Sequence, residues 1–242
     1  MNRNVGANTV AVTTTHGAES AVAAKLAERG FGVVEVPVIS IVATNDKGVV
    51  AALRNLRSGD VVAVTSTNGA RAVSRASLSR PRGVRVAAVG PTTAAHLEHA
   101  GWAADMVPAT STATDLAVAI GDPSGTGRVL FVSAEVPRPT LTERLTAAGW
   151  VVDRVVAYRT DLFEPDPVAV IAALGADAMT FTSGSTVRGW AAATPEAPPL
   201  VVSIGPSTSE AAIQAGFDLA IEAKTHTADG VVAAVERLFR LA

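Results

Sequence analysis

An internal repeat that covers nearly all of the 242 residues constrains this chain more than any other sequence feature. The stretch VRVAAVGPTTAAHLEHAGW near the middle matches LVVSIGPSTSEAAIQAGF near the end. Gly90 then aligns with Gly205, an offset of 205 − 90 = 115 residues, and Gly101 aligns with Gly216. A pattern used twice predicts two similar structural units.

Two further matches lie upstream and keep the same order. VVAVTSTNGARAV, over residues 61–73, corresponds to AMTFTSGSTVRGW, over residues 178–190. Residues 9–39 parallel residues 128–158 and place Gly30 against Gly149, and both glycines are predicted to end helices. The loop GDPSGTGR, over residues 121–128, joins the two copies.

Within each copy, short β-branched runs alternate with helical patterns. Val22 with Leu26, and Leu141 with Leu145, have the spacing of one helix face. The strand runs are continuously apolar, which is typical of parallel strands covered on both faces. The sequence therefore predicts an α/β fold with two doubly wound parallel-sheet lobes of flavodoxin-like topology.

Two extended stretches interrupt this alternation, PVISIVA over residues 37–43 and VAYRTDLF over residues 156–163. Neither is followed by a recognisable helix pattern of its own. We interpret them as the crossovers between the lobes.

Composition sets limits on function. Hydrophobic residues make up 48% of the chain and charged residues 17%, which is enough apolar surface for packed cores. A formal net charge of −2 predicts no nucleic-acid or anionic-membrane partner. The chain has no cysteine, which excludes disulfides and thiolate chemistry, and its polar start and short apolar runs predict neither secretion nor a membrane span. We expect a cytoplasmic protein.

Small hydroxyl-bearing and glycine residues follow the predicted strands. In parallel sheets, ligands bind at the carboxyl ends of strands, where helix N-termini expose N–H groups that attract anions. Ordinary helix capping by Ser, Thr and Asn is the alternative interpretation for any single loop. The five stretches are Thr13–Thr15, Thr65–Asn68, Gly90–Thr93, Thr182–Ser185 and Gly205–Thr208.

Other kinds of site are not predicted. No GxGxxG motif follows a strand, and residues 121–128 lack the spacing and the lysine of a P-loop. His96 and His99 could share a helix face, but without a third ligand nearby we expect a solvated surface and no metal site. His16, in a loop at a strand end, either touches a ligand or simply starts a helix.

Tyr158 is the only tyrosine of the chain and lies in the second crossover, within Tyr158-Arg159-Thr160. A phenol there could donate a proton or a hydrogen bond to a ligand. Packing of a strand tyrosine is the alternative.

These motifs, in this order, resemble the uroporphyrinogen-III synthases. The resemblance rests on Thr65-Ser66 with Asn68-Gly69, Val89 to Thr93, Gly149 to Thr160, Thr182-Ser183 and Ile204 to Thr208. It implies a HemD-like fold of two lobes joined by a two-stranded β-ribbon. Residues 1–36 and 164–242 would form lobe 1, residues 44–155 an inserted lobe 2, and residues 37–43 and 156–163 the ribbon.

The resemblance also implies a function. Members of the family close the linear tetrapyrrole hydroxymethylbilane, which carries eight carboxylates, into uroporphyrinogen III, with inversion of the last ring (ring D) and loss of water. No metal or organic cofactor is involved, and we expect a monomer acting on this small molecule. Tyr158 would be the proton donor to the departing hydroxyl. Arg138 lies near a point where many members carry an arginine. The substrate-binding residues would be Thr14, Thr65, Ser66, Asn68, Gly90, Thr92, Thr93, Ser133, Arg138, Thr182, Ser183, Ser185, Ser207 and Thr208.

Two alternatives stay open at this point. A non-catalytic tetrapyrrole-binding or regulatory paralogue could keep the fold and lose turnover. An unrelated two-lobed binding protein of the periplasmic type could share only the architecture, although the absence of a signal-peptide pattern argues against it.

Overall fold

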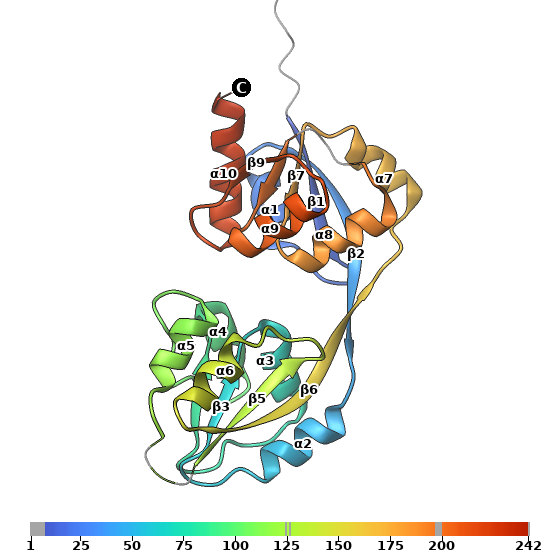
Figure 1. Cartoon of the computed structure of the whole chain (residues 1–242). Helices are drawn as coiled ribbons and strands as arrows, with labels where there is room; N and C mark the ends of the chain where they lie inside the picture. Colours follow the sequence, from blue (N-terminus) through green and yellow to red (C-terminus); the bar gives the residue numbers. More distant parts are fainter. Residues whose placement is uncertain (1–7, 124, 126, 197–199, 242) are drawn as a thin grey trace, which may run out of the picture. The chain divides into compact units, whose positions relative to one another are not determined.

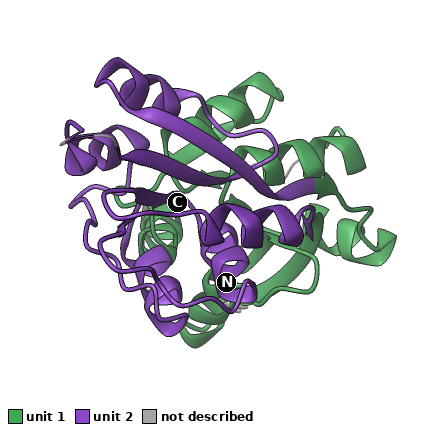
Figure 2. Ribbon diagram, turned by 90° about the horizontal axis from the view of Figure 1, so that it is seen from below, with its two compact units in different colours: residues 1–40, 161–242 green, residues 41–160 purple. Residues whose placement is uncertain are grey.

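The computed structural model describes residues 8–123, 125, 127–196 and 200–241. The chain divides into two compact units, unit 1 (residues 1–40 and 161–242) and unit 2 (residues 41–160), which Figure 2 shows in different colours. Strands β2 (Gly32–Ala43) and β6 (Val151–Leu162) each run through the division between the units, so each contributes to both (Figure 1). The polar start of the chain, and residues 124 and 126 of the loop between the copies, lie outside the described residues.

Unit 2 contains a parallel sheet with the strand order β4-β3-β5-β6. Helices alternate with its strands along the chain, as the repeat predicts. In chain order its elements between β2 and β6 are α2 (Asp46–Arg54), β3 (Val61–Val64), α3 (Thr67–Arg75), β4 (Arg85–Ala88), α4 (Pro91–His99), α5 (Ala113–Ile120), β5 (Arg128–Ala134) and α6 (Thr140–Ala147).

Both faces of the unit 2 sheet are covered. Val62 and Val64 pack into a core cluster with residues of α2, α3 and α4. Val61 and Ala63 point to the other face and pack with residues of α5 and α6. Successive strand residues alternate between the faces, so strands buried on both sides must be apolar throughout, as the sequence has them.

Unit 1 repeats this arrangement with the order β2-β1-β7-β8-β9. The ladders that join β1, β2, β7, β8 and β9 are parallel. Its further elements are β1 (Thr9–Thr15), α1 (Ala21–Glu28), α7 (Pro167–Leu174), β7 (Ala178–Phe181), α8 (Gly184–Ala193), β8 (Val201–Ser203), α9 (Pro206–Gln214), β9 (Leu219–Glu222) and α10 (Ala228–Leu241).

The unit 1 sheet also has a core on each face. Ala11 packs with residues of α7, α8 and α9, and its neighbours Val10 and Val12 pack with residues of α1 and α10. Each unit is therefore doubly wound, which confirms the predicted fold class.

Strands β2 and β6 are neighbours and form the predicted two-stranded ribbon. Within unit 1 the Phe163 N–H donates to the Val38 carbonyl at 3.0 Å, and within unit 2 the Thr44 N–H donates to the Ala157 carbonyl at 3.2 Å. Because residue numbers rise along one strand as they fall along the other, this pair is antiparallel. The lobe boundaries given in the sequence analysis stay predictions.

One expectation about the crossovers is wrong, because a helix follows each of them. Helix α2 begins three residues after β2 ends, and α7 begins at Pro167, soon after β6. The sequence PVAVIAAL of α7 has no polar face, and of its residues only Ala173 is buried. The apolar periodicity that marks an amphipathic helix is therefore missing there.

The paired glycines end helices in both copies, as predicted. Gly30 and Gly149 have φ of 83° and 93°, and Gly101 and Gly216 have φ of 76° and 80°. This left-handed region is open to glycine at little cost, which explains why the repeat keeps these residues.

None of the described helices is both long and apolar enough to span a bilayer.

Candidate functional site

The predicted site residues are divided between the two units. Most of them follow the carboxyl end of a strand, whereas Thr14 and Ser133 lie in the last residues of β1 and β5 and Tyr158 lies within β6. Unit 2 holds Thr65, Ser66, Asn68, Gly90, Thr92, Thr93, Ser133, Arg138 and Tyr158. Unit 1 holds Thr14, Thr182, Ser183, Ser185, Ser207 and Thr208.

Serine side chains cap the helices that follow β3 and β7. Ser66 Oγ accepts a hydrogen bond from the Gly69 N–H at 3.1 Å at the start of α3. Ser183 Oγ accepts one from the Thr186 N–H at 3.2 Å at the start of α8. The capping interpretation is therefore confirmed for both serines, and any ligand contact of these residues would come in addition to it.

Helices α4 and α9 begin differently, with Gly90-Pro91 and Gly205-Pro206 and without a side-chain cap. The first turn of a helix leaves N–H groups without intrahelical partners, and here no capping side chain satisfies them. Thr93 and Thr208 are only 4% and 2% exposed, so their side chains belong to the packing of these helices. Thr92 is exposed and Ser207 is half-buried, so these two helix starts can offer an anion their backbone N–H groups and these two hydroxyls.

A loop closes over each of these glycines. A Cβ on Gly90 would lie 2.4 Å from Ser111 Oγ, and one on Gly205 would lie 2.7 Å from His226 Cδ2. Ser111 and His226 are separated by 226 − 111 = 115 residues, the same offset as the two glycines. Neither residue is among those predicted from the sequence, although extending the repeat beyond Gly101 and Gly216 at this offset pairs them.

Tyr158 lies on β6 directly after an irregularity in the strand. Ser133 on β5 pairs with Val156 and the next residue, Ala134, pairs with Tyr158, so Ala157 is an extra residue on β6. A β-bulge of this kind changes which face a side chain points to. As a result Ala157 and Tyr158 both pack in the core cluster beside α3, although they are consecutive.

The phenol of Tyr158 is buried and hydrogen-bonded. Its hydroxyl oxygen lies 2.8 Å from Ser66 Oγ, and either oxygen could be the donor. The residue is 9% exposed. Burial raises the pKa of the Tyr158 phenol above its ordinary value of 10.0, and the hydrogen bond with Ser66 opposes this rise. The phenol is therefore protonated at neutral pH.

A glycine in the first turn of α3 makes this contact possible. Ser66 follows β3 and Tyr158 lies on β6, two strands away, a separation of about 9–10 Å across the sheet. A Cβ on Gly69 would lie 2.9 Å from Val64 Cγ1 and 3.1 Å from the Val132 carbonyl oxygen of β5. Without that Cβ, the start of α3 can lie close over β5, which brings Ser66 within reach of β6.

The equivalent position in unit 1 has no phenol. The matched segments 9–39 and 128–158 align Ile39 with Tyr158, and β2 carries the corresponding bulge, since Thr14 pairs with Pro37 and Thr15 with Ile39. Ser183, which aligns with Ser66, has Ser185 Oγ at 2.8 Å instead. The two units share the strand bulge and the serine-capped helix, but only unit 2 has a phenol hydroxyl at this position.

Other predicted residues near the ends of β1 and β5 differ in exposure. Thr14 and Ser133 are 7% and 1% exposed, and the Ser133 hydroxyl donates to the Ala134 carbonyl at 2.9 Å. Arg138 is exposed in the loop before α6. His16 follows β1 and stacks on Phe163, with ring centroids 3.9 Å apart.

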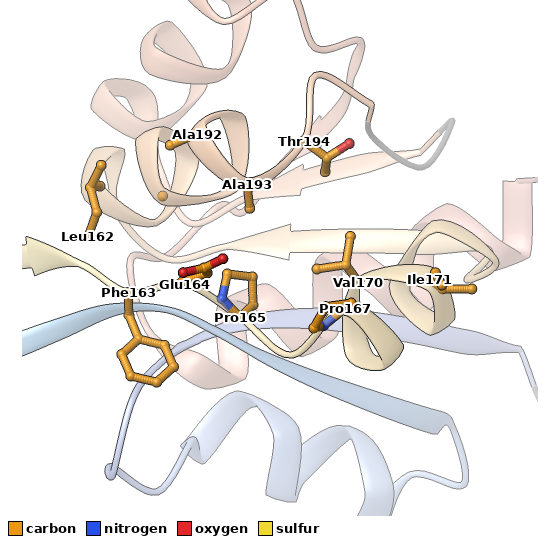
Figure 3. A pocket seen from close by; sticks show the side chains of 11 residues that line it. Leu162, Phe163, Glu164, Pro165, Pro167, Val170, Ile171, Ala192, Ala193 and Thr194 are labelled. Atoms are coloured by element: carbon orange, nitrogen blue, oxygen red, sulfur yellow. The ribbon is translucent and has the colours of Figure 1, made fainter.

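Two cavities among those formed by the described residues have walls without any of the predicted site residues. One of about 590 Å³ lies in unit 1 beside the end of β6, α7 and α8, with Phe163, Pro165 and Val170 among its lining residues (Figure 3). The other, of about 550 Å³, lies in unit 2 near the amino ends of β3 and β5, with Arg57 and Arg128 in its wall. Within the described part of the chain, no group of three His, Cys, Asp or Glu residues could hold a metal ion.

The chain is similar to proteins of one family over almost its whole length. The family model described as uroporphyrinogen-III synthase HemD matches residues 20–233. A uroporphyrinogen-III synthase of Synechococcus elongatus is 27% identical, and the match covers 96% of each chain.

Solved structures share the fold. The uroporphyrinogen-III synthetase of Helicobacter pylori 26695 has a TM-score of 0.66 at 14% identity, covering 98% of this chain and 100% of that one. A mutant uroporphyrinogen III synthase of Thermus thermophilus has a TM-score of 0.64 at 20% identity, with the same coverage. These similarities confirm the resemblance that the motifs carry: the chain belongs to the uroporphyrinogen-III synthase family.

Proposed function

We propose that this chain is a hydro-lyase that cyclises hydroxymethylbilane to uroporphyrinogen III in tetrapyrrole biosynthesis, with inversion of ring D and loss of water, and without a metal or organic cofactor. Family membership supports the reaction. The observation that supports the assignment of roles is the buried phenol of Tyr158 on β6, which is hydrogen-bonded to Ser66 at the start of α3.

The first step removes the hydroxyl group of the substrate. The C–O bond breaks with its electron pair on oxygen, the oxygen takes the Tyr158 proton, and water leaves. The pyrrole nitrogen, which keeps its proton, supplies electron density to the carbon left behind, and this gives an azafulvenium cation whose charge is balanced by the Tyr158 phenolate. Ring closure later releases a proton from a pyrrole carbon, and the Tyr158 phenolate accepts it, so the enzyme is regenerated.

A buried phenol suits this step for a physical reason. Its raised pKa keeps it protonated at neutral pH, so it is always ready to act as an acid. A phenol is a stronger acid than water, so it can protonate an oxygen that departs with its electron pair. General acid catalysis of this kind contributes about 100- to 10,000-fold in rate.

The remaining task is to hold a flexible polyanion so that attack occurs at the substituted position of ring D. The uncapped starts of α4 and α9 offer backbone donors to carboxylates. Thr65, Asn68 and Ser185 are half-buried and can add side-chain hydrogen bonds. Arg138 supplies an exposed cation in the loop before α6. Positioning of this kind decides which isomer forms, because the free bilane closes without inversion.

The same proposal makes the protein a cytoplasmic monomer with a small-molecule partner and no nucleic-acid or membrane partner. The formal charge of −2 supports the absence of nucleic-acid and anionic-membrane partners. The absence of cysteine supports a cytoplasmic location.

Incubation with freshly generated hydroxymethylbilane, followed by chromatographic separation of the product isomers, tests the function. We expect isomer III in excess over a protein-free control. Formation of isomer I alone would reject the proposal. Thermal stabilisation by the bilane without isomer III would identify a binding protein that lacks turnover.

A further inference from the structure

The hydrogen bond between Tyr158 and Ser66 raises a question of direction. The two hydroxyl oxygens are 2.8 Å apart, and either could donate. If Tyr158 donated to Ser66, the phenol proton would be held away from a substrate. If Ser66 donates, the phenol proton stays available and the phenol oxygen keeps a donor after the proton has left.

The cap of α3 favours the second direction. A serine hydroxyl has one proton to donate and two lone pairs. One lone pair of Ser66 Oγ already accepts the Gly69 N–H at 3.1 Å. Accepting this bond polarises the Ser66 O–H and makes it a better donor. The helix N-terminus also carries partial positive charge, which stabilises negative charge that develops on a neighbouring oxygen.

The second copy of the repeat shows that capping alone does not require this contact. Ser183 caps α8 through the Thr186 N–H, as Ser66 caps α3 through the Gly69 N–H. The residue aligned with Tyr158 is Ile39, which has no hydroxyl, and Ser183 pairs with Ser185. Both units therefore have the capping serine, but the hydrogen bond from this serine to a phenol is found in unit 2 and not at the aligned position of unit 1.

We propose that Ser66 is a positioning residue: it donates its hydroxyl proton to the Tyr158 oxygen, directs the phenol proton toward the substrate and stabilises the phenolate while the proton is away. This inference rests on the proposed function, since it assumes that Tyr158 acts as the acid. It assigns Ser66 a role in proton transfer in addition to the substrate contact expected from the sequence.

Three substitutions of Ser66 separate this role from capping. Ser66→Ala removes both, and we expect kcat for isomer III to fall about 10- to 100-fold, with a much smaller change in KM. Ser66→Thr keeps the cap and the donor and should restore most of kcat. Ser66→Asp keeps a strong cap but offers only acceptors, so Tyr158 must donate to it, and kcat should fall although the fold is stable.

Ser20→Ala is the matched control for the loss of a cap. Ser20 Oγ accepts the Ala23 N–H at 3.2 Å at the start of α1, with the same spacing as Ser66 and Gly69. We expect a similar loss of stability, about 1 kcal/mol by the usual value of a serine cap, and unchanged kcat.

A second measurement does not depend on turnover. Tyr158 is the only tyrosine, so the ultraviolet absorbance of tyrosinate reports its ionisation alone. Because the Ser66 hydrogen bond lowers the pKa of Tyr158, the titration of Ser66→Ala should move to higher pH, while that of Ser20→Ala should not move. Circular dichroism at each pH confirms that the protein stays folded.

The outcomes are distinct. A wild-type protein that makes no isomer III contradicts the proposed function itself. An active wild type, with Ser66→Ala or Ser66→Asp within about two-fold of its kcat and an unmoved tyrosine titration, contradicts the role of Ser66.

Discussion

Gly69 and Val132 lie so close together that a side chain on the glycine would place its Cβ 3.1 Å from the carbonyl oxygen of Val132. This is the point where the first turn of α3 lies over β5. Because Gly69 has no side chain between the helix and the sheet, Ser66 at the start of α3 reaches Tyr158 on β6, the strand beyond β5. The absence of a Cβ at Gly69 thus permits the close packing of α3 on β5, and this packing determines the position of Ser66 relative to Tyr158, the proposed acid.

Gly69→Ala tests this link. The added Cβ would lie 2.9 Å from Val64 Cγ1 and 3.1 Å from the Val132 oxygen, and backbone cannot move aside cheaply. We expect a loss of about 1–3 kcal/mol in unfolding free energy and a reduced kcat, because α3 must move away from β5. Chemical denaturation and the isomer assay measure the two effects.

Gly175→Ala is the control for this substitution. Its Cβ would meet only ordinary contacts, at 3.6 Å and beyond, and its φ is −85°. It should be neutral or stabilise by up to about 1 kcal/mol. Equal effects of the two substitutions would show that the close approach at Gly69 is unimportant.

Tyr158→Phe removes the phenol oxygen and keeps the ring. We expect kcat for isomer III to fall about 100- to 10,000-fold, with KM little changed, because the acid is lost while substrate contacts stay. The melting temperature should change little, since only one hydrogen bond is removed. Retention of full turnover and of the same isomer ratio would refute the catalytic role.

Stability at alkaline pH should depend on the same residue. The unfolded chain loses the tyrosine proton near pH 10.0, whereas burial raises the pKa in the folded protein. The stabilisation that comes from the protonated phenol is therefore complete below about pH 10 and is lost as pH rises through the folded pKa. The unfolding free energy, measured by chemical denaturation at a series of pH values, should be lost more steeply above about pH 10 for the wild type than for Tyr158→Phe, and the two should run parallel between about pH 8 and pH 10. Parallel curves would contradict the raised pKa.

Gly205 and His226 should be energetically coupled. Gly205→Ala would place its Cβ 2.7 Å from His226 Cδ2, so the exposed ring must move and the start of α9 is disturbed. We expect KM for the bilane to rise in Gly205→Ala and to recover partly in the double variant with His226→Ala. A double-mutant cycle should give a coupling of about 0.5–3 kcal/mol, as is usual for residues in contact, and simple additivity would exclude the contact.

The repeat made much of the fold predictable. It located the helix-ending glycines and the Gly-Pro helix starts, because local backbone conformation determines those residues directly. The apolar strand runs predicted covered sheets, and both faces of both sheets have cores. The helix α7 was missed because Val168 and Ile171 are 72% and 71% exposed on a helix without a polar face.

The arrangement around Tyr158 could not be predicted in the same way. The bulge at Ala157 leaves no trace in an alternating pattern, since β6 reads as continuous strand sequence. The contact with Ser66 joins residues 92 positions apart and depends on how far α3 extends over a neighbouring strand. Sequence could name both residues through family motifs, but the hydrogen bond between them is a consequence of packing.

The placement of β1 has a consequence for how the protein is made. This strand pairs with β7, so Val10 lies beside Ala178, while all of unit 2 is encoded between them. During synthesis the first strand leaves the ribosome long before this neighbour exists, whereas residues 41–160 form a contiguous segment that can fold as soon as it emerges. Unit 1 can be completed only after its second half has been made, and until then its apolar first strand lacks the β7 partner.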